Sequence, residues 1–400
     1  MMGAVRDPAK HILLYGERGL GKTSLSNTFW QSSNTLRNPI LAARVQADAS
    51  DNFSSLWSRA LVEFQQATIH YNPSISSDFE RVTPDIVRRE FQKLPPRVLF
   101  IMTIDEFDLL REQKTRELTA NLLKSLHDHA INVTVLLIGI ADNVEELIIN
   151  HQSLRRVLSL VKLERMNIFD LSKILDSRLR STPLKLSDDA RSEIVTLSRG
   201  LPYYVQSLGK SAIQNSVRRQ HTLVEIEDVN AAIENFLLES GQSFSDDYQR
   251  ATDSRQASNI SHGVLLASAL AHADTGGFFK PSDVCEMLNL IVLGNNYHHA
   301  RVHQYLSKFT LDRRARILIR GGAKGGYRYR FSDALMQPFI VMRAIKDTTI
   351  DDRLRHRLFH LGRGQLLDRG YRLGVAEANA TQLGMVVPTI TEGQARMSIA

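Results

Sequence analysis

A glycine-rich segment near the start of the chain has the residue types and spacing needed to bind phosphate. Residues 16–23, Gly-Glu-Arg-Gly-Leu-Gly-Lys-Thr, fit the pattern G-x-x-x-x-G-K-[ST]. The glycines let successive backbone N–H groups turn toward an anion, Lys22 supplies a positive charge for the β- and γ-phosphates, and the Thr23 hydroxyl is a suitable Mg²⁺ ligand. A glycine-rich turn with a chance Gly-Lys-Thr is the alternative. The candidate phosphate-binding residues are Gly16, Glu17, Arg18, Gly19, Leu20, Gly21, Lys22, Thr23 and Ser24.

The residues on either side of this loop decide between the two interpretations. The apolar segment 11–15 precedes it and predicts a short buried strand. Leu25, Phe29 and Trp30 follow at the spacing of one helix face, and the helix is expected to begin near Lys22. A helix that begins there adds its positive dipole end to the anion site. The order strand, glycine loop, helix therefore favours a phosphate-binding loop.

A second pattern predicts the carboxylates that such a site needs. Residues 98–104 are mostly apolar and end abruptly at Asp105 and Glu106, which indicates a buried parallel strand with two acids at its carboxyl end. Ligands bind at that edge of open α/β sheets. Asp105 is expected to hold Mg²⁺, directly or through water, and Glu106 to orient the attacking water. The alternative is a helix N-terminus, where acids such as Asp108 favour the dipole.

A third apolar segment, 133–140, predicts another strand of the same sheet. Polar residues follow it closely, and a polar side chain at this edge could contact the γ-phosphate or the water. Asn143 is the candidate for that contact, and Asp142 is the second choice. A turn or a helix cap is the alternative, because Asp and Asn favour both.

Composition limits the class of protein. Four hundred residues predict two or three domains, and 43% hydrophobic with 23% charged residues is typical of a globular protein. Cys285 is the only cysteine, so the chain can form no internal disulfide and no cysteine-cluster zinc site. No apolar run approaches the roughly 18 residues of a membrane span, and residues 1–10 lack the apolar core of a secretory signal. We expect a cytoplasmic protein without a membrane partner.

The net charge is concentrated in one region. Residues 301–372 contain 17 lysines and arginines and 6 aspartates and glutamates, a local net charge of +11. Because the whole chain carries +7, the remainder sums to −4. This segregation is typical of an attached module that binds a polyanion, and a solvated basic face without a ligand is the alternative.

The same region predicts a small helical module with a hairpin. Apolar stripes indicate helices at 264–270, near 281–288 and at 298–309, and two strands, 315–319 and 327–331, flank a glycine-rich turn. Three short helices and a hairpin suggest a winged helix, which places its third helix in the DNA major groove and its hairpin on the backbone. The candidate DNA contacts are the basic residues of the segment 313–330, which contains no acidic residue: Arg313, Arg314, Arg316, Arg320, Lys324, Arg328 and Arg330. Binding of a protein partner is the alternative.

The order of the motifs resembles that of the AAA+ ATPases. The phosphate-binding loop, the Ile-Asp-Glu-Phe-Asp box at 104–108 and the strand at 137–143 match that group in sequence. The chain is most similar to the origin-recognition initiators of archaea and eukaryotes and to related bacterial ATPases, with the STAND NTPases as neighbours. The resemblance covers roughly residues 11–240, and a weaker match follows residue 260. It implies ATP hydrolysis with Mg²⁺ and a helical lid over the nucleotide.

The resemblance also implies roles for single residues. Arg156 falls where such proteins carry an arginine finger, which would reach the γ-phosphate of a neighbouring subunit in a homo-oligomer; a surface arginine is the alternative. The Gly-x-x-Arg sensor of many AAA+ proteins is missing at 200–203. Pro202 instead resembles the STAND pattern, whose proline packs near adenine, and Arg199 is a candidate substitute sensor.

Together these observations predict an α/β protein with a P-loop NTPase parallel sheet flanked by helices, followed by an α-helical lid and a winged-helix domain. The expected boundaries are 1–165 for the ATPase core, 166–240 for the lid, 241–260 for a polar linker, 261–345 for the winged helix and 346–400 for a basic helical segment and tail. The expected function is an ATP-hydrolysing switch that couples nucleotide state to binding of double-stranded DNA or to oligomer assembly. The alternative is a STAND-like signalling or defence regulator whose winged helix binds protein.

Overall fold

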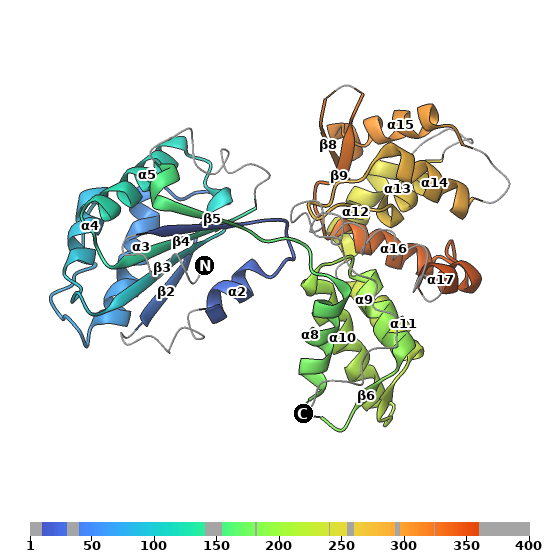
Figure 1. Cartoon of the computed structure of the whole chain (residues 1–400), viewed down its shortest axis with the longest axis horizontal. Coiled ribbons are helices and arrows are strands. Elements are labelled where there is room, and N and C mark those ends of the chain that lie inside the picture. Colours follow the sequence, from blue (N-terminus) through green and yellow to red (C-terminus); the bar gives the residue numbers. More distant parts are fainter. Residues whose placement is uncertain are drawn as a thin grey trace, which may run out of the picture. The chain divides into compact units, whose positions relative to one another are not determined.

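The computed structural model describes residues 10–29, 40–140, 154–180, 182–239, 241–253, 260–292, 297–323 and 325–359. The chain divides into two compact units, Met1–Arg165 and Met166–Ala400. Figure 1 labels their helices and strands. Within the described residues, no helix has both the length and the apolar character needed to cross a membrane.

Unit 1 is built around a parallel sheet of five strands in the order β2-β3-β4-β1-β5. Its elements, in chain order, are β1 His11–Tyr15, α2 Lys22–Phe29, β2 Ile40–Gln46, α3 Phe53–Thr68, α4 Pro84–Gln92, β3 Leu99–Asp105, η2 Phe107–Leu109, α5 Gln113–Asp128, β4 Val133–Gly139, α7 Leu154–Val157 and β5 Leu158–Lys162. The strands predicted at 11–15, 98–104 and 133–140 are therefore present and parallel, and the predicted α/β class is confirmed.

Helices cover both faces of this sheet. Alternate residues of one strand point to opposite faces, and in β1 Leu13 packs with the helices α3, α4 and α5 while Ile12 and Leu14 belong to a second apolar cluster on the other side. Leu25 of α2 packs against that second cluster. Both faces are thus buried, which explains why the strands are continuous apolar runs.

One histidine lies inside this core. His11, on the central strand β1, is fully buried, and its Nε2 lies 2.9 Å from the Leu123 carbonyl oxygen. The backbone N–H of Val135 donates to His11 Nδ1 at 3.1 Å. Both ring nitrogens are paired only if the ring is neutral with its proton on Nε2. Burial accordingly lowers the pKa of His11 from 6.5 to about 4.

Unit 2 is mainly helical. Its elements are α8 Ile168–Leu179, β6 Lys185–Leu186, α9 Asp188–Leu197, α10 Pro202–Arg218, β7 Leu223–Val224, α11 Ile226–Glu239, α12 Gly241–Thr252, α13 Ser261–Leu270, α14 Pro281–Ile291, α15 His299–Lys308, η3 Asp312–Arg314, β8 Leu318–Gly321, β9 Arg328–Phe331, α16 Met336–Lys346 and α17 Asp352–Phe359. Strands β6 and β7 pair in parallel and β8 and β9 form an antiparallel hairpin. Helices α8 to α11 occupy the segment expected to be a lid.

The segment expected to be a polar linker contains a helix instead. Helix α12 covers most of it, and its Phe244 packs on Phe339 of α16 with ring centroids 5.4 Å apart. Ala251 and Thr252 at its end are buried. The segment was predicted to be a linker because Ser, Asp and Gln dominate its composition. Its few apolar residues, Phe244, Tyr248 and Ala251, nevertheless recur at helical spacing.

Candidate nucleotide-binding site

The predicted phosphate-binding loop connects β1 to α2, as the motif requires. Gly21 has φ +82°, a left-handed conformation that L-residues with a side chain rarely adopt, and α2 begins at the next residue. Gly16 is glycine for another reason: a Cβ there would lie 2.4 Å from the Leu163 carbonyl oxygen. The loop therefore places helix α2 with its N-terminus at the end of β1, where backbone N–H groups can bind an anion.

Lys22 is buried and held over this loop by main-chain oxygens. Its Nζ donates to the carbonyl oxygens of Gly16 at 2.9 Å and Glu17 at 2.7 Å. Burial lowers the pKa of Lys22 below its usual value, and the carboxylates of Asp108, Asp105 and Glu17 oppose that shift. The ammonium group is thus fixed at the loop, in reach of a bound phosphate chain.

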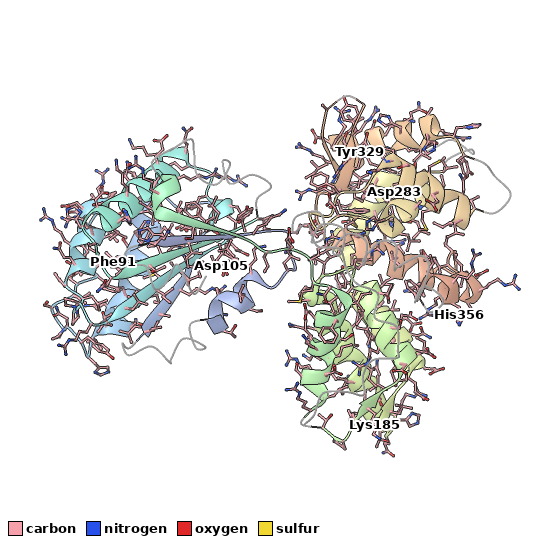
Figure 2. All side chains as sticks on the ribbon, viewed as in Figure 1. Phe91, Asp105, Lys185, Asp283, Tyr329 and His356 are labelled. Carbon is pink, nitrogen blue, oxygen red and sulfur yellow. The ribbon has the colours of Figure 1, made fainter. Side chains whose placement is uncertain are left out.

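The loop and the acidic strand end meet through a direct hydrogen bond. Thr23 Oγ1 donates to Asp105 Oδ2 at 2.7 Å, although the two residues are 82 positions apart. Asp105 is buried at the carboxyl end of β3, where Figure 2 labels it. Hydroxyl and carboxylate oxygens are both suitable ligands for Mg²⁺. The two residues predicted as Mg²⁺ ligands are therefore brought together.

Strand β2 adds two polar side chains that the sequence analysis missed. Arg44 Nη2 donates to the same Asp105 Oδ2 at 2.7 Å, and Gln46 Nε2 donates to Glu106 Oε2 at 2.6 Å. Both pairings follow from the register of β2 against β3, in which Gln46 lies opposite Asp105. The detectable signal was a pair of polar residues ending the segment 40–46. That segment alone does not show that it neighbours β3.

Glu106 adopts an unusual backbone conformation. Its φ is +54°, in the left-handed region, and its N–H donates to Asp105 Oδ1 at 2.9 Å. Such conformations cost free energy and tend to occur at functional sites. The turn lets β3 end at Asp105 while the next residue, Glu106, is exposed at the end of the strand. Asp108 has a structural contact, since its Oδ1 accepts the N–H of Ile140 at the end of β4 at 2.8 Å.

Glu17 contributes more than a backbone amide to the loop. Its carboxylate pairs with Arg165, which lies between β5 and α8, through Nε–Oε2 at 2.6 Å and Nη2–Oε1 at 3.1 Å. The two residues are 148 positions apart, and no short-range pattern in the sequence indicates this contact.

The other predicted site residues lie on α2, α7 and α10 or outside the described residues. Asn143 and Asp142 fall in the segment 141–153, which lies outside the described residues. Arg156 is exposed on α7, and Ser24 is exposed on α2. Pro202 is buried within unit 2 as the first residue of α10.

Arg199 has a contact other than the sensor role considered for it. Its Nη2 donates to the carbonyl oxygen of Ala271 at 2.8 Å and to that of Leu270 at 3.3 Å, at the carboxyl end of α13. An arginine satisfies the last carbonyls of a helix in this way. This contact gives Arg199 a structural role between α9 and α13, and the sensor role considered for it stays a prediction.

The seven predicted DNA-contacting residues separate into three groups. Arg313, Arg316, Arg320 and Arg328 are exposed, and Arg328 lies 3.3 Å from Asp274. Arg314 and Arg330 are engaged within unit 2: Arg314 donates to carbonyl oxygens at the end of α12, and Arg330 lies 5.1 Å from the Phe278 ring centroid. Lys324 lies outside the described residues.

Comparison with known proteins agrees with this geometry. Residues 5–148 match the family described as an AAA domain. No curated protein matches the chain. A Walker-type ATPase of Pyrococcus abyssi has a similar structure, with 16% identity, a TM-score of 0.50 and coverage of 85% of this chain and 93% of that chain.

Two further solved structures are similar at lower scores. The ORC2 protein of Aeropyrum pernix has 14% identity and a TM-score of 0.49, and covers 88% of this chain and 92% of its own. The ORC1 protein of the same organism in complex with DNA has 17% identity and a TM-score of 0.45, with coverage of 87% and 88%.

The sheet, the loop and the acidic strand end define the class of protein. Unit 1 has the P-loop NTPase fold, and residues 5–148 within it match the AAA domain. The match to the AAA domain lies wholly within unit 1.

Proposed function

We propose that this protein is an ATP-driven switch in which Mg²⁺-dependent ATP hydrolysis in unit 1 controls the binding of double-stranded DNA by unit 2. The observation that carries the enzymatic half is the hydrogen bond between Thr23 and Asp105, beside Glu106. It joins the phosphate-binding loop to the carboxylates that hydrolysis needs. The segregated positive charge of the C-terminal region supports the DNA-binding half.

Hydrolysis would use five side chains. Lys22 and the backbone N–H groups of the loop bind the phosphates and neutralise charge as it develops. Thr23 and Asp105 are the residues that would hold Mg²⁺, which supplies further charge neutralisation on the phosphate oxygens when bound. Glu106 orients the attacking water by accepting a hydrogen bond from it. Gln46 fixes the direction of the Glu106 carboxylate through their 2.6 Å hydrogen bond.

The proposed DNA-binding module consists of α13, α14, α15 and the β8–β9 hairpin. This order of three helices and a hairpin supports a winged-helix interpretation. The buried face of α15 is formed by Val302, Tyr305 and Leu306. Arg301 and Gln304 of the helix are exposed, as is His298, the residue before it. Helix α15 is therefore the proposed groove-reading element.

Exposed arginines extend this proposed surface onto the hairpin. Arg320 of β8 lies 4.6 Å from the Tyr327 ring centroid, and Arg313 and Arg316 precede the strand. Such residues bind phosphate without regard to base sequence. Arg314 and Arg330 are not part of the proposed surface, because they are only partly exposed: Arg314 donates to a carbonyl oxygen of α12, and Arg330 lies over the Phe278 ring.

The switch is tested by measuring duplex binding in different nucleotide states. Fluorescence anisotropy of a labelled duplex is followed with full-length protein alone, with ADP and with a non-hydrolysable ATP analogue. Allosteric coupling typically changes affinity about 5- to 150-fold, and we expect a change of roughly tenfold between the ADP and ATP-analogue states. Equal affinities in all three states would refute the switch. Absence of duplex binding with ATP-dependent assembly in light scattering would favour the signalling-regulator alternative.

A further inference from the structure

The ion pair between Glu17 and Arg165 connects the phosphate-binding loop to the segment that leads out of unit 1. Arg165 Nε donates to Glu17 Oε2 at 2.6 Å, and Arg165 Nη2 donates to Glu17 Oε1 at 3.1 Å. The side chains are only 10% and 7% exposed. A two-pronged contact between a planar guanidinium and a carboxylate fixes the relative orientation of the groups as well as their distance.

The backbone brings the same two segments together. Leu163 N donates to the Tyr15 carbonyl oxygen at 2.7 Å, which extends the pairing of β5 with β1 to the edge of the loop. The Leu163 carbonyl oxygen is the atom that a Cβ on Gly16 would meet at 2.4 Å. Residues 163–165 therefore touch the loop through their backbone and through the ion pair, and neither segment can shift without the other.

Glu17 is also linked to the lysine that must bind phosphate. Its carbonyl oxygen accepts Lys22 Nζ at 2.7 Å, and the Gly16 carbonyl oxygen accepts the same group at 2.9 Å. A lysine ammonium has three hydrogens to donate, and phosphate oxygens would compete with these carbonyls for them. If Lys22 releases the Glu17 carbonyl oxygen to bind phosphate, the backbone of Glu17 loses a contact while its side chain is still held by Arg165.

Arg165 has an electrostatic consequence as well. Glu17 places a negative charge in a loop whose purpose is to bind an anion, and it raises the pKa of Lys22 against the effect of burial. The guanidinium offsets that charge. If Arg165 alone is removed, a largely buried carboxylate is left without its cation beside the incoming phosphates, an arrangement that is strongly unfavourable.

We propose that Glu17 and Arg165 are positioning residues that couple occupancy of the phosphate-binding loop to residues 163–166, where unit 1 ends and unit 2 begins in the chain. The inference rests on the proposed ATP switch and names its coupling element. Glu17 and Arg165 contact each other, and neither takes part in the chemical step of ATP hydrolysis. Nucleotide binding should change the backbone of 163–166 only while the ion pair is intact.

Three variants separate the charge effect from the coupling effect. Arg165→Met leaves Glu17 unpaired, Glu17→Gln keeps a hydrogen-bond acceptor for Arg165, and the double variant Glu17→Met with Arg165→Met removes both charges. Replacing a buried ion pair by apolar residues is often tolerated, so the double variant keeps the test valid if the single arginine variant fails to fold. Arg88→Met, which breaks an ion pair with Asp85 on α4, is the matched control.

Two readouts are measured on full-length protein. Affinity for a fluorescent ATP analogue should fall roughly tenfold or more in Arg165→Met and fall less in the double variant, because only the single variant leaves a largely buried carboxylate without its cation. Hydrogen exchange of amides 163–166 should change on ATP-analogue binding in the wild type and in Arg88→Met. The change should be lost in the double variant even at saturating nucleotide.

The outcomes distinguish this inference from the proposed switch. An unchanged nucleotide-dependent exchange at 163–166 in the double variant, or wild-type ATP affinity in folded Arg165→Met, would overturn the coupling role. Wild-type protein whose duplex binding ignores nucleotide, while exchange at 163–166 still responds, would refute the switch and leave the coupling intact. Loss of nucleotide-dependent duplex binding in the double variant supports both.

Discussion

The ATP site of unit 1 and the basic surface of unit 2 use charge in opposite ways. At the ATP site two carboxylates have fixed partners: Asp105 is held by Thr23 and Arg44, and Glu17 by Arg165. On the proposed DNA surface, Arg313, Arg316 and Arg320 are exposed. The first arrangement sets geometry, and the second sets an electrostatic field. Substitutions at the two regions should therefore differ in size, in salt dependence and in additivity.

The largest effect is expected at Glu106. Glu106→Gln keeps an acceptor for the Gln46 amide but removes the negative charge that polarises water. We expect the hydrolysis rate to fall at least ~100-fold, as is typical for loss of a general base, with nucleotide affinity nearly unchanged. Steady-state phosphate release and fluorescent-nucleotide titration measure the two quantities.

Glu63, exposed on α3, offers a matched control because Glu63→Gln removes the same charge on a helix that carries none of the proposed site residues. It should hydrolyse ATP at the wild-type rate. If Glu106→Gln retains the wild-type rate, then Glu106 is not the activating carboxylate and the proposed site in unit 1 is wrong.

A second effect concerns the core of unit 1. The pKa of His11 is about 4 in the folded protein, against the ordinary value of 6.5 that applies to the unfolded chain. Above pH 6.5 the imidazole is neutral in both states, and stability is undiminished. As the pH falls from 6.5 toward 4, the unfolded chain binds a proton that the folded core excludes, so unfolding becomes easier by roughly 3 kcal/mol in total.

Urea unfolding of wild type and His11→Gln at pH 7.5, 5.5 and 4.5 checks this expectation. Carboxylates titrate in both proteins, so the difference between the two curves isolates the histidine. Wild type should lose more stability than the variant across the window. Parallel curves would show that His11 does not exclude the proton.

A third effect tests the exposed charges. Replacing Arg313, Arg316 and Arg320 together by Gln should weaken duplex binding and reduce the slope of log K against log salt by about 0.9 for each phosphate that is no longer neutralised. Anisotropy at several salt concentrations measures both. The matched control replaces three other exposed arginines of unit 2 by Gln, Arg178 and Arg180 at the end of α8 and Arg218 at the end of α10. Equal losses in the two variants would mean that the binding is not localised on the hairpin.

The parts of unit 1 that could be predicted are those encoded in short segments. β1, β3 and β4 are apolar runs, and the loop is a contiguous motif, so all were evident from the sequence. Strand β2 was missed because Ala42, Ala43 and Arg44 break the apolar pattern. Its neighbour in the sheet is set by strand order, which is a property of the whole fold.

Long-range partners were missed for a related reason. Gln46 contacts Glu106 from 60 positions away, and Arg165 contacts Glu17 from 148. Charge counts locate a basic region but not the orientation of each side chain, so Arg314 and Arg330 could not be separated from the exposed arginines in advance. Only the folded structure shows which arginines are partly buried against unit 2 and which are exposed to solvent.

The smallest effect is expected at Arg314, which is partly buried against α12. Arg314 Nη1 donates to the Ala251 carbonyl oxygen at 3.1 Å and to that of Asp253, so it caps the carboxyl end of α12. Arg314→Gln should lower the free energy of unfolding by about 1 kcal/mol, the usual contribution of such hydrogen bonds, and leave the salt slope of DNA binding unchanged. Arg320→Gln should do the reverse, because its side chain is exposed. Thermal unfolding and anisotropy on the same two variants measure both quantities. A lowered salt slope in Arg314→Gln without loss of stability would place Arg314 on the DNA surface and remove the distinction between partnered and exposed charges in unit 2.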